Sequence, residues 1–484
     1  MDSTGTVITK ASRPLTLLRG LPPDYMEQQP EDWWVATVET IKECLSNRKV
    51  DAHKIRAIGV SGQQHGLVPL DGEGNVIRPA KLWNDTSTAA EAEALIEKLG
   101  GLSRVIELIG NGIPPGFTAP KILWLKMHEP ENYRRLSTIL LPHNYLNYRL
   151  TGAMSMEYGD ASGTALMDIR SRQWRRDVVE AIDPELMDKL PRLGPSNEPA
   201  GHLSAMASET FGLSQDVIVS AGGGDNMMGA IGTGNTKKGV VTVSLGTSGT
   251  VYAFSKKPVV DPKGEIASFC DSTNHWLPLV CTMNVTVATD LACKAFNINY
   301  EELEEAVEST PVGSDGLLFL PYLTGERTPN IPAGRGVLYG LTTKNYNPQC
   351  IPRATMEGVT LGLNYGLNRL REIGVDPTEV RLTGGGARNK AWRRVAADVF
   401  NADVVTLEEE EGATFGAAIQ AMWCHRKIDG KKEDISEITD ELVRLDEGIR
   451  VKPDPANAEK YCGLQRQHDA LMGTLRGFFG AGKP

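Results

Sequence analysis

The stretch VIVSAGGGDNMMGAIG, residues 217–232, decides the fold of this 484-residue chain. A short apolar run breaks at three glycines, and an acid and a second apolar segment follow. This order predicts a buried strand, a tight turn and a helix. Asp225 stands where the helix begins, so it is predicted to be the helix N-cap. A carboxylate at that place is also able to accept a proton from a substrate hydroxyl, and the two roles are compatible.

Short apolar runs and helical periodicities alternate on both sides of that stretch, which predicts an α/β fold with layered domains. The predicted helices are residues 31–45, 354–370 and 413–423. The predicted strands are residues 5–10, 55–61, 217–221, 316–323, 380–382 and 404–407, and a strand, turn and strand at 240–254. A polar, glycine-rich boundary, GTGNTKK at 232–238, divides the chain into a first domain at 1–235 and a second at 236–484.

Composition excludes several classes of function. The chain carries 61 acidic and 51 basic residues, a net charge of −10, so a nucleic-acid partner is not expected. The seven cysteines contain no Cys-x-x-Cys pair, and the eight histidines contain no His-x-x-x-His spacing, which gives a zinc site no support. No apolar run is long enough for a bilayer, and the start lacks the form of a signal peptide. A cytoplasmic protein without a membrane partner is therefore expected.

The first candidate for binding phosphate is SLGTSGT at 244–250. A tight turn through Gly246 presents several backbone N–H groups together, and such a concavity suits a phosphate. The hydroxyls of Thr247 and Ser248 add possible donors. An ordinary hairpin turn is the competing interpretation of the same pattern.

The second glycine-rich candidate is LTGGGARNKAW at 382–392, where a predicted strand enters glycines and then a helix. Gly385 and Gly386 leave no side chain over the backbone, so a base or ribose can lie against it. Asn389 occupies the place of the last glycine in a dinucleotide fingerprint, so that fingerprint fails. Tight packing of a strand against a helix is the alternative.

Polar residues at the end of the strand predicted at 55–61 are candidates for binding a ligand with neutral hydroxyls. Gln64 and His65 offer mixed donors and acceptors for neutral hydroxyls. Further along, Trp83 and Asp85 offer a stacking surface and a carboxylate. The competing interpretations are a satisfied loop histidine and a core tryptophan followed by a turn.

Taken together, these motifs resemble the FGGY family of carbohydrate kinases from about residue 2 to residue 475, and within it the kinases that act on D-xylulose. LPYLTGERTPNIPAGRGVLYGL at 320–341 adds a fifth motif in the same order. The resemblance implies two actin-like, ribonuclease-H-like ATPase domains with an interdomain cleft. It implies ATP-dependent phosphorylation of a pentulose, most closely D-xylulose to D-xylulose 5-phosphate, and a homodimer. Another ketose or polyol, or a sugar- or nucleotide-binding pseudokinase, remain the alternatives.

The resemblance also implies residue roles. Asp225 is the implied general base, and it helps hold Mg²⁺. The implied contacts to the ketose are Gln64, His65 and Asn226. Thr247 and its neighbours are expected to hold the terminal phosphates of ATP. The residues expected to line the adenosine site are Gly385, Gly386 and Asn389.

Family members begin with a strand and an Asp-x-Gly-Thr loop, whereas this sequence begins with MDSTGTVITKAS. The first domain is therefore expected to lack its initial strand. Because the ladder partners of that strand would be unsatisfied, we expect the chain as written to be poorly stable. A start codon assigned too late is the favoured explanation, and a shortened form and a degenerate kinase are the others.

Overall fold

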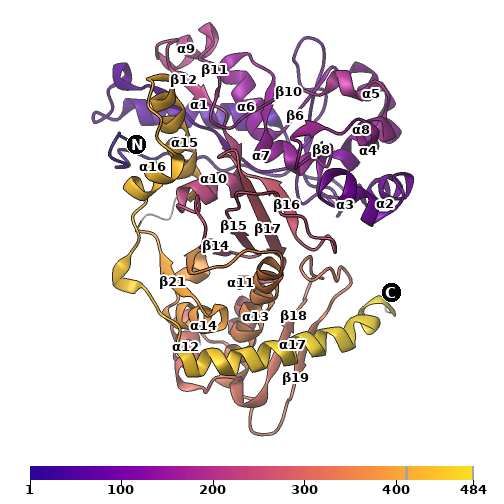
Figure 1. Cartoon of the computed structure of the whole chain (residues 1–484), viewed down its shortest axis with the longest axis vertical. Coiled ribbons are helices and arrows are strands. Elements are labelled where there is room, and N and C mark those ends of the chain that lie inside the picture. Colours follow the sequence, from indigo (N-terminus) through magenta and orange to yellow (C-terminus); the bar gives the residue numbers. More distant parts are fainter. Residues whose placement is uncertain (409–411, 482–484) are drawn as a thin grey trace.

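The computed structural model describes residues 1–408 and 412–481. Its largest sheet has six strands in the order β16-β17-β15-β14-β20-β21 and lies in the middle and lower part of Figure 1. The parallel members β14, β20 and β21 are rich in valine and buried, as expected for strands covered on both faces. The strands are β14 (Val240–Leu245), β15 (Gly249–Ala253), β16 (Ala267–Cys270), β17 (Trp276–Thr282), β20 (Glu379–Thr383) and β21 (Asp403–Thr406).

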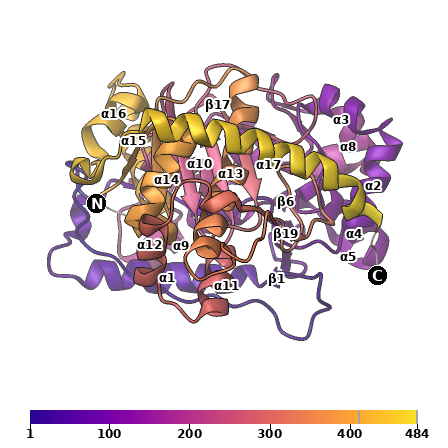
Figure 2. The same cartoon turned by 90° about the horizontal axis from the view of Figure 1, so that it is seen from below.

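One face of this sheet carries the helices of the second half. The long helix α13 (Cys350–Glu372) packs on β15 and β17, and residues 352–364 are all buried, as in a helix enclosed on every side. The helix α17 (Pro455–Ala481) crosses over α13 and α14, as Figure 2 shows. The other elements here are α11 (Thr286–Phe296), α12 (Tyr300–Ser309), α14 (Lys390–Phe400), β18 (Leu318–Pro321) and β19 (Gly336–Tyr339).

The first half is built from helices around short strands. Two segments pair in parallel: β2 (Ala57–Ile58) with β12 (Ile218–Ser220), and β3 (Ser61–Gly62) with β13 (Gly223–Gly224). Its helices are α1 (Pro30–Ser46), α2 (Ala89–Lys98), α3 (Leu102–Ile109), α4 (Thr118–His128), α5 (Pro130–Arg135), α6 (Pro142–Thr151), α7 (Tyr158–Ala161), α8 (Arg176–Ile182), α9 (Ala205–Phe211) and α10 (Asp225–Gly232). Its other strands are β1 (Glu27–Gln28), β4 (Val68–Leu70), β5 (Ala80–Lys81), β6 (Thr138–Leu140), β7 (Ser155–Glu157), β8 (Met167–Asp168), β9 (Gln173–Trp174), β10 (Arg192–Gly194) and β11 (Pro199–His202).

Two helices from near the end of the chain return to the first half. In Figure 1 the gold helices α15 (Gly412–Ile428) and α16 (Ile435–Leu442) lie beside its indigo and magenta elements. The helices α10 and α15 cross at glycines, because a Cβ on Gly232 would come within 1.7 Å of the Gly412 carbonyl oxygen. A Cβ on Gly416 would come within 1.8 Å of the Met228 carbonyl oxygen. Only glycine permits this approach.

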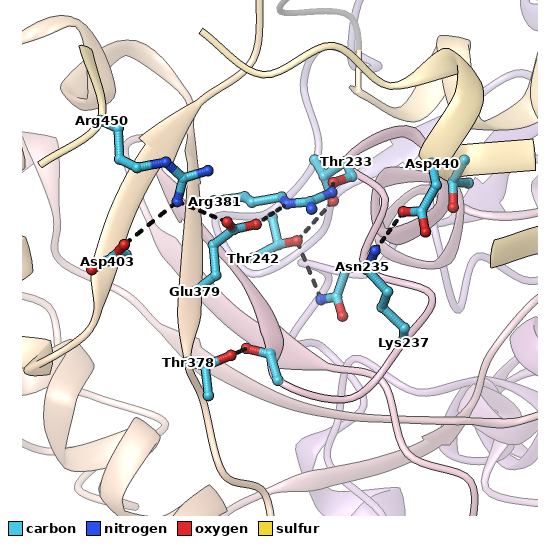
Figure 3. A network of polar contacts seen from close by, with 12 residues as sticks. Thr233, Asn235, Lys237, Thr242, Thr378, Glu379, Arg381, Asp403, Asp440 and Arg450 are labelled. Carbon is cyan, nitrogen blue, oxygen red and sulfur yellow. Dashed lines mark hydrogen bonds and ion pairs between the residues drawn. The ribbon is translucent and has the colours of Figure 1, made fainter. Parts of the chain in front are cut away.

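The segment that joins the halves is held by side chains, as Figure 3 shows. The Thr233 and Thr242 hydroxyl oxygens lie 2.7 Å apart, and Arg381 donates to the Thr233 carbonyl. The Asn235 amide donates to the Tyr252 carbonyl at 2.9 Å. The boundary predicted near this segment stays a prediction, but the segment itself is anchored to the six-stranded sheet.

Most elements expected from periodicity are confirmed, including the helices at 31–45, 354–370 and 413–423 and the strands at 240–254, 380–382 and 404–407. The strand predicted at 5–10 is wrong, since these residues form none. The Asp2 carboxylate accepts the backbone N–H groups of Thr4 and Thr6 instead, and this local turn competes with an extended chain. None of the described helices has the length and apolarity needed to cross a membrane.

Candidate active site

Asp225 is the first residue of α10 and directly follows the glycine turn 222–224. Gly224 is the N-cap, so the prediction that Asp225 caps the helix is wrong by one position. Its carboxylate accepts the backbone N–H of Asn226 at 2.9 Å, and the helix dipole favours a negative charge there. The side chain is exposed on its open side, while the protein behind it desolvates the carboxyl and raises its pKa to about 6. An accessible carboxylate with such a pKa suits proton acceptance.

A buried amide from α15 holds the glycine turn in place. Gln420 is fully buried. Its oxygen accepts the Gly222 N–H at 2.9 Å and the Ser220 hydroxyl at 2.9 Å. Its nitrogen donates to the carbonyls of Gly222 at 3.1 Å and Ser272 at 3.3 Å. Four contacts from one planar group fix the direction in which the chain enters Asp225.

The opposite side of the turn is equally restricted. The Asn147 amide of α6 donates to the Ala221 carbonyl at 2.7 Å. Gly222 has a φ of 70°, and a Cβ there would lie 2.8 Å from the Val60 carbonyl oxygen. Both the backbone conformation and the lack of space require glycine. The turn is therefore a rigid support for the acid that follows it.

Gln64 and Asn226 meet beside Asp225, because β3 pairs with β13. The Asn226 amide donates to the Gln64 side-chain oxygen at 2.9 Å. The Gln64 nitrogen is buried, and no hydrogen-bond partner for it is found in the part of the chain that the structure describes. A buried donor without a partner is costly. It fits a ligand that brings an acceptor, such as a sugar hydroxyl.

His65 is fixed as a neutral ring. Its Nδ1 lies 2.8 Å from the Gly163 carbonyl oxygen, and the ring stacks on Phe117 with centroids 4.3 Å apart. Burial, with the Lys121 charge, lowers its pKa to about 3. The Lys121 ammonium also donates to the His65 carbonyl at 2.9 Å. A neutral imidazole that donates through Nδ1 keeps Nε2 as an acceptor for a hydroxyl.

The other two candidates for sugar contact differ from each other. Trp83 is half-buried, and its role as a stacking surface stays a prediction. Asp85 is fully buried. It accepts the Met26 N–H at 2.9 Å, the Lys81 ammonium at 3.3 Å and the Ser87 hydroxyl. Because these groups occupy both carboxylate oxygens, the observed contacts of Asp85 are structural, and its contact with a sugar stays a prediction.

The turn between β14 and β15 consists of Gly246, Thr247 and Ser248, and Thr247 is exposed. The Gly246 carbonyl accepts from the Thr286 N–H at 2.9 Å, and the Thr247 carbonyl from the Val285 N–H at 3.0 Å. In a trans peptide the N–H points opposite to the carbonyl. The N–H groups of Thr247 and Ser248 therefore point away from α11, as a phosphate-binding turn requires.

The second glycine turn leaves the same edge of the sheet, because β20 runs parallel to β14 with Thr383 opposite Ser244. Gly385 is exposed, and a Cβ there would meet no atom within 4 Å. Gly386 is buried against Leu245. Asn389 is the N-cap of α14 and accepts the Trp392 N–H at 2.8 Å. The two turns predicted to bind ATP thus lie side by side.

Within residues 1–408 and 412–481, no three His, Cys, Asp or Glu residues are grouped so as to hold a metal ion. One carboxylate, Asp225, stands at the predicted place. Magnesium usually keeps several waters and binds one or two carboxylates together with substrate phosphates. The donor set therefore fits Mg²⁺ delivered with a nucleotide better than a metal held by protein ligands alone.

Sequence reasoning missed the residues that support the site. Gln420 is one of only two polar residues in the helix predicted at 413–423, the other being Thr414, and that signal was available. Asn147 carries no such signal, since only the folded chain brings it to the glycine turn. Arg327 lies in a motif noted for its family resemblance, but no contact was predicted for it.

The fold, the glycine turn before Asp225 and the two glycine turns at the edge of the six-stranded sheet define a two-domain α/β kinase. The N-terminal domain of the FGGY family of carbohydrate kinases matches residues 1–232, and the C-terminal domain of that family matches residues 241–425. The chain belongs to the FGGY family of carbohydrate kinases, which use ATP and a sugar.

Individual members of this family are similar to the chain along most of its length. The xylulose kinase of Haemophilus influenzae is 42% identical over 442 residues, which is 90% of this chain and 88% of the relative. The xylulose kinase of Bacillus subtilis is 37% identical over 445 residues, 90% of this chain and 86% of the relative. The crystal structure of xylulose kinase from Bifidobacterium adolescentis has a TM-score of 0.79 and 32% identity, and the match covers 91% of this chain and 92% of that one.

Proposed function

We propose that this protein transfers the γ-phosphate of ATP to D-xylulose and produces D-xylulose 5-phosphate. The observation that carries the proposal is the position of Asp225, an accessible carboxylate with a pKa of about 6 beside the Gln64 amide. Relatives named xylulose kinase, at 42% and 37% identity, favour this sugar. The other ketoses and polyols remain the alternatives that a substrate panel tests.

Each group has a role that its surroundings support. Asp225 accepts the proton as the sugar oxygen attacks, and Gln64, His65 and Asn226 orient the neutral hydroxyls. The turn at 246–248 offers N–H donors to the phosphates of ATP. Donors fixed before the reaction stabilise developing charge without reorganisation.

The nucleotide contacts are part of the same proposal. Gly385 and Gly386 lie under the adenosine, and Asn389 fixes the helix that follows. Asp225 would hold Mg²⁺ together with the phosphates of ATP, and the bound ion would neutralise phosphate charge. We further propose a sugar-binding domain at 1–235, a nucleotide-binding domain at 236–484, a cytoplasmic location and a homodimer.

The test is Asp225→Ala with coupled detection of ADP. Loss of a general base costs about 10²- to 10⁴-fold in turnover, so we expect turnover to fall at least about 10²-fold while ADP affinity stays within about threefold. Asp216→Ala is the control, because Asp216 is an exposed aspartate whose carboxylate, within the described residues, accepts only the nearby Ser214 hydroxyl. Retained turnover in Asp225→Ala would remove that residue from its role. A panel of ketoses and polyols in which D-xylulose is a poor substrate would overturn the sugar assignment alone.

A further inference from the structure

The Arg327 side chain reaches from the second half of the chain to the predicted sugar segment of the first. Arg327 lies between β18 and β19 and is exposed. Its guanidinium carbon lies 5.6 Å from the centroid of the Trp83 ring. Its Nη1 donates to the Cys281 sulfur of β17 at 3.8 Å. The guanidinium therefore sits where the six-stranded sheet meets Trp83.

The backbone on either side of Arg327 is firmly anchored. The Glu326 carboxylate is buried, and it accepts the N–H groups of Arg327 at 2.8 Å and Met283 at 2.7 Å. Thr328 is buried too, and its hydroxyl donates to the Glu265 carbonyl at 2.8 Å. Because the backbone on both sides is anchored, the exposed guanidinium can occupy only a limited region. Anion binding requires a donor that is positioned in this way.

Within residues 1–408 and 412–481 the Arg327 guanidinium forms no ion pair, although its charge opposes the rise that burial causes in the pKa of the adjacent Glu326. The Arg327 charge nonetheless affects the pKa values of neighbouring groups. Burial raises the pKa of Cys281, Arg327 opposes that rise, and Asp225 adds to it. Arg327 also contributes to the low pKa of His65, after burial and Lys121. The Arg327 guanidinium therefore contacts Cys281 and Trp83 directly, and its charge acts on His65 in the predicted sugar segment.

We propose that Arg327 binds the phosphoryl group while it moves from ATP to the sugar, and afterwards the phosphate of the product. This inference rests on the proposed function. The sugar oxygen forms a bond to γ-phosphorus as its proton passes to Asp225. The bond to the β–γ bridging oxygen breaks, and ADP keeps that electron pair. Arg327 stays protonated throughout, and its planar fork of donors matches the phosphoryl oxygens.

The first test compares the turnover of Arg327→Ala and Arg327→Lys. An arginine on a transferring phosphoryl group contributes about 10³-fold or more in phosphoryl-transfer enzymes. We therefore expect kcat to fall about 10³-fold in Arg327→Ala, with unchanged melting temperature and a KM for D-xylulose within about threefold. Lysine keeps the charge without the fork, so Arg327→Lys is expected to recover about tenfold.

The control is Arg335→Ala. Arg335 lies in the same segment and is exposed, and within the described part of the chain it donates only to the nearby carbonyls of Ala333 and Gly334. Its kcat is expected to stay within about twofold of wild type. An unchanged kcat in Arg327→Ala, or an equal loss in Arg335→Ala, would overturn the proposal.

A binding experiment without turnover separates this inference from the proposed function. Calorimetry with D-xylulose and with D-xylulose 5-phosphate is expected to show that Arg327→Ala loses at least about tenfold in affinity for the phosphorylated sugar and keeps its affinity for the free sugar. Equal losses for both would reduce Arg327 to a packing partner of Trp83 and overturn the inference. A wild-type protein that binds the sugar phosphate through Arg327 but phosphorylates no sugar in the panel would contradict the proposed function instead.

Discussion

The glycine turn before Asp225 and the two glycine turns predicted for ATP differ in how the protein holds them. The turn at 222–224 is buried, and side chains from α6 and α15 fix it from two sides. The turns at 246–248 and 384–386 lie at an open edge, and exposed residues occur in both. Hydrogen bonds to their carbonyls, or the strands beside them, hold these two turns in place. The turns offer backbone N–H groups rather than side chains to a ligand.

This difference in support matches the expected roles of the turns, which are to position a general base and to bind a nucleotide. A general base must stand at one distance and angle from the hydroxyl it deprotonates, so its support has to be rigid. A nucleotide brings phosphates that several N–H groups share, so a backbone concavity suffices. We expect changes at the rigid turn to reduce kcat, and changes at the open turns to weaken ATP binding.

The largest effect is expected from a matched pair of glycine substitutions. Gly222 has a φ of 70° and Gly384 a φ of 81°, and a Cβ on either would lie 2.8 Å from a carbonyl oxygen. Each conformation is unfavourable for a residue with a side chain, by about 1–3 kcal/mol, and the clash with a carbonyl oxygen is similar at the two positions. Gly222→Ala is expected to lower kcat at least about 10²-fold with little change in KM for ATP, because it displaces the acid.

Gly384→Ala is expected to raise KM for ATP about tenfold and to leave kcat within about threefold. Steady-state kinetics and thermal melting of both variants check this. If both variants have similar melting temperatures and show the same changes in kcat and in KM for ATP, the two turns do not have separate roles in catalysis and ATP binding.

A smaller effect is expected from Gln420→Ala. The change leaves the Ser220 hydroxyl and the Gly222 N–H without their partner, and an unmet buried group costs about 1–3 kcal/mol. We expect kcat to fall about 10- to 30-fold, with KM for ATP unchanged, because Asp225 loses its alignment.

Gln465→Ala is the control for that change. Gln465 is a buried amide on α17, bonded to Asn364 at 2.9 Å and to Asp469 at 2.8 Å. It should lower the melting temperature by a comparable amount and leave kcat unchanged. Equal kcat values for the two variants would show that Gln420 is structural only.

The rigid turn also shows how far the sequence alone leads. Apolar runs and glycines predicted the strand, the turn and Asp225, since these depend on local pattern. They also predicted both turns at the nucleotide edge. They did not predict Gln420 or Asn147, because those contacts join residues about 198 and 74 positions apart. The wrong strand at 5–10 shows the converse, since a local alternation forms no strand without a neighbour.

The smallest effect concerns the acid itself. Desolvation raises the folded-state pKa of Asp225 from 3.8 to about 6, so kcat/KM is expected to fall as pH drops through about 6. The same shift affects stability. The folded protein binds this proton more tightly than the unfolded chain, so the contribution of Asp225 to stability is fully present below pH 3.8 and is lost as pH rises through about 6.

Asp225→Asn replaces the titrating carboxyl by a neutral amide, so the loss of stability with rising pH does not occur in this variant. Its melting temperature is therefore expected to exceed that of wild type by an amount that grows between pH 4 and 7 and then levels off. Differential scanning calorimetry across this range measures the difference. The gain should be modest, because water reaches the open side of the carboxylate. A difference that is constant with pH would mean that Asp225 titrates alike in both states, and the rigid turn would then orient the acid without tuning it.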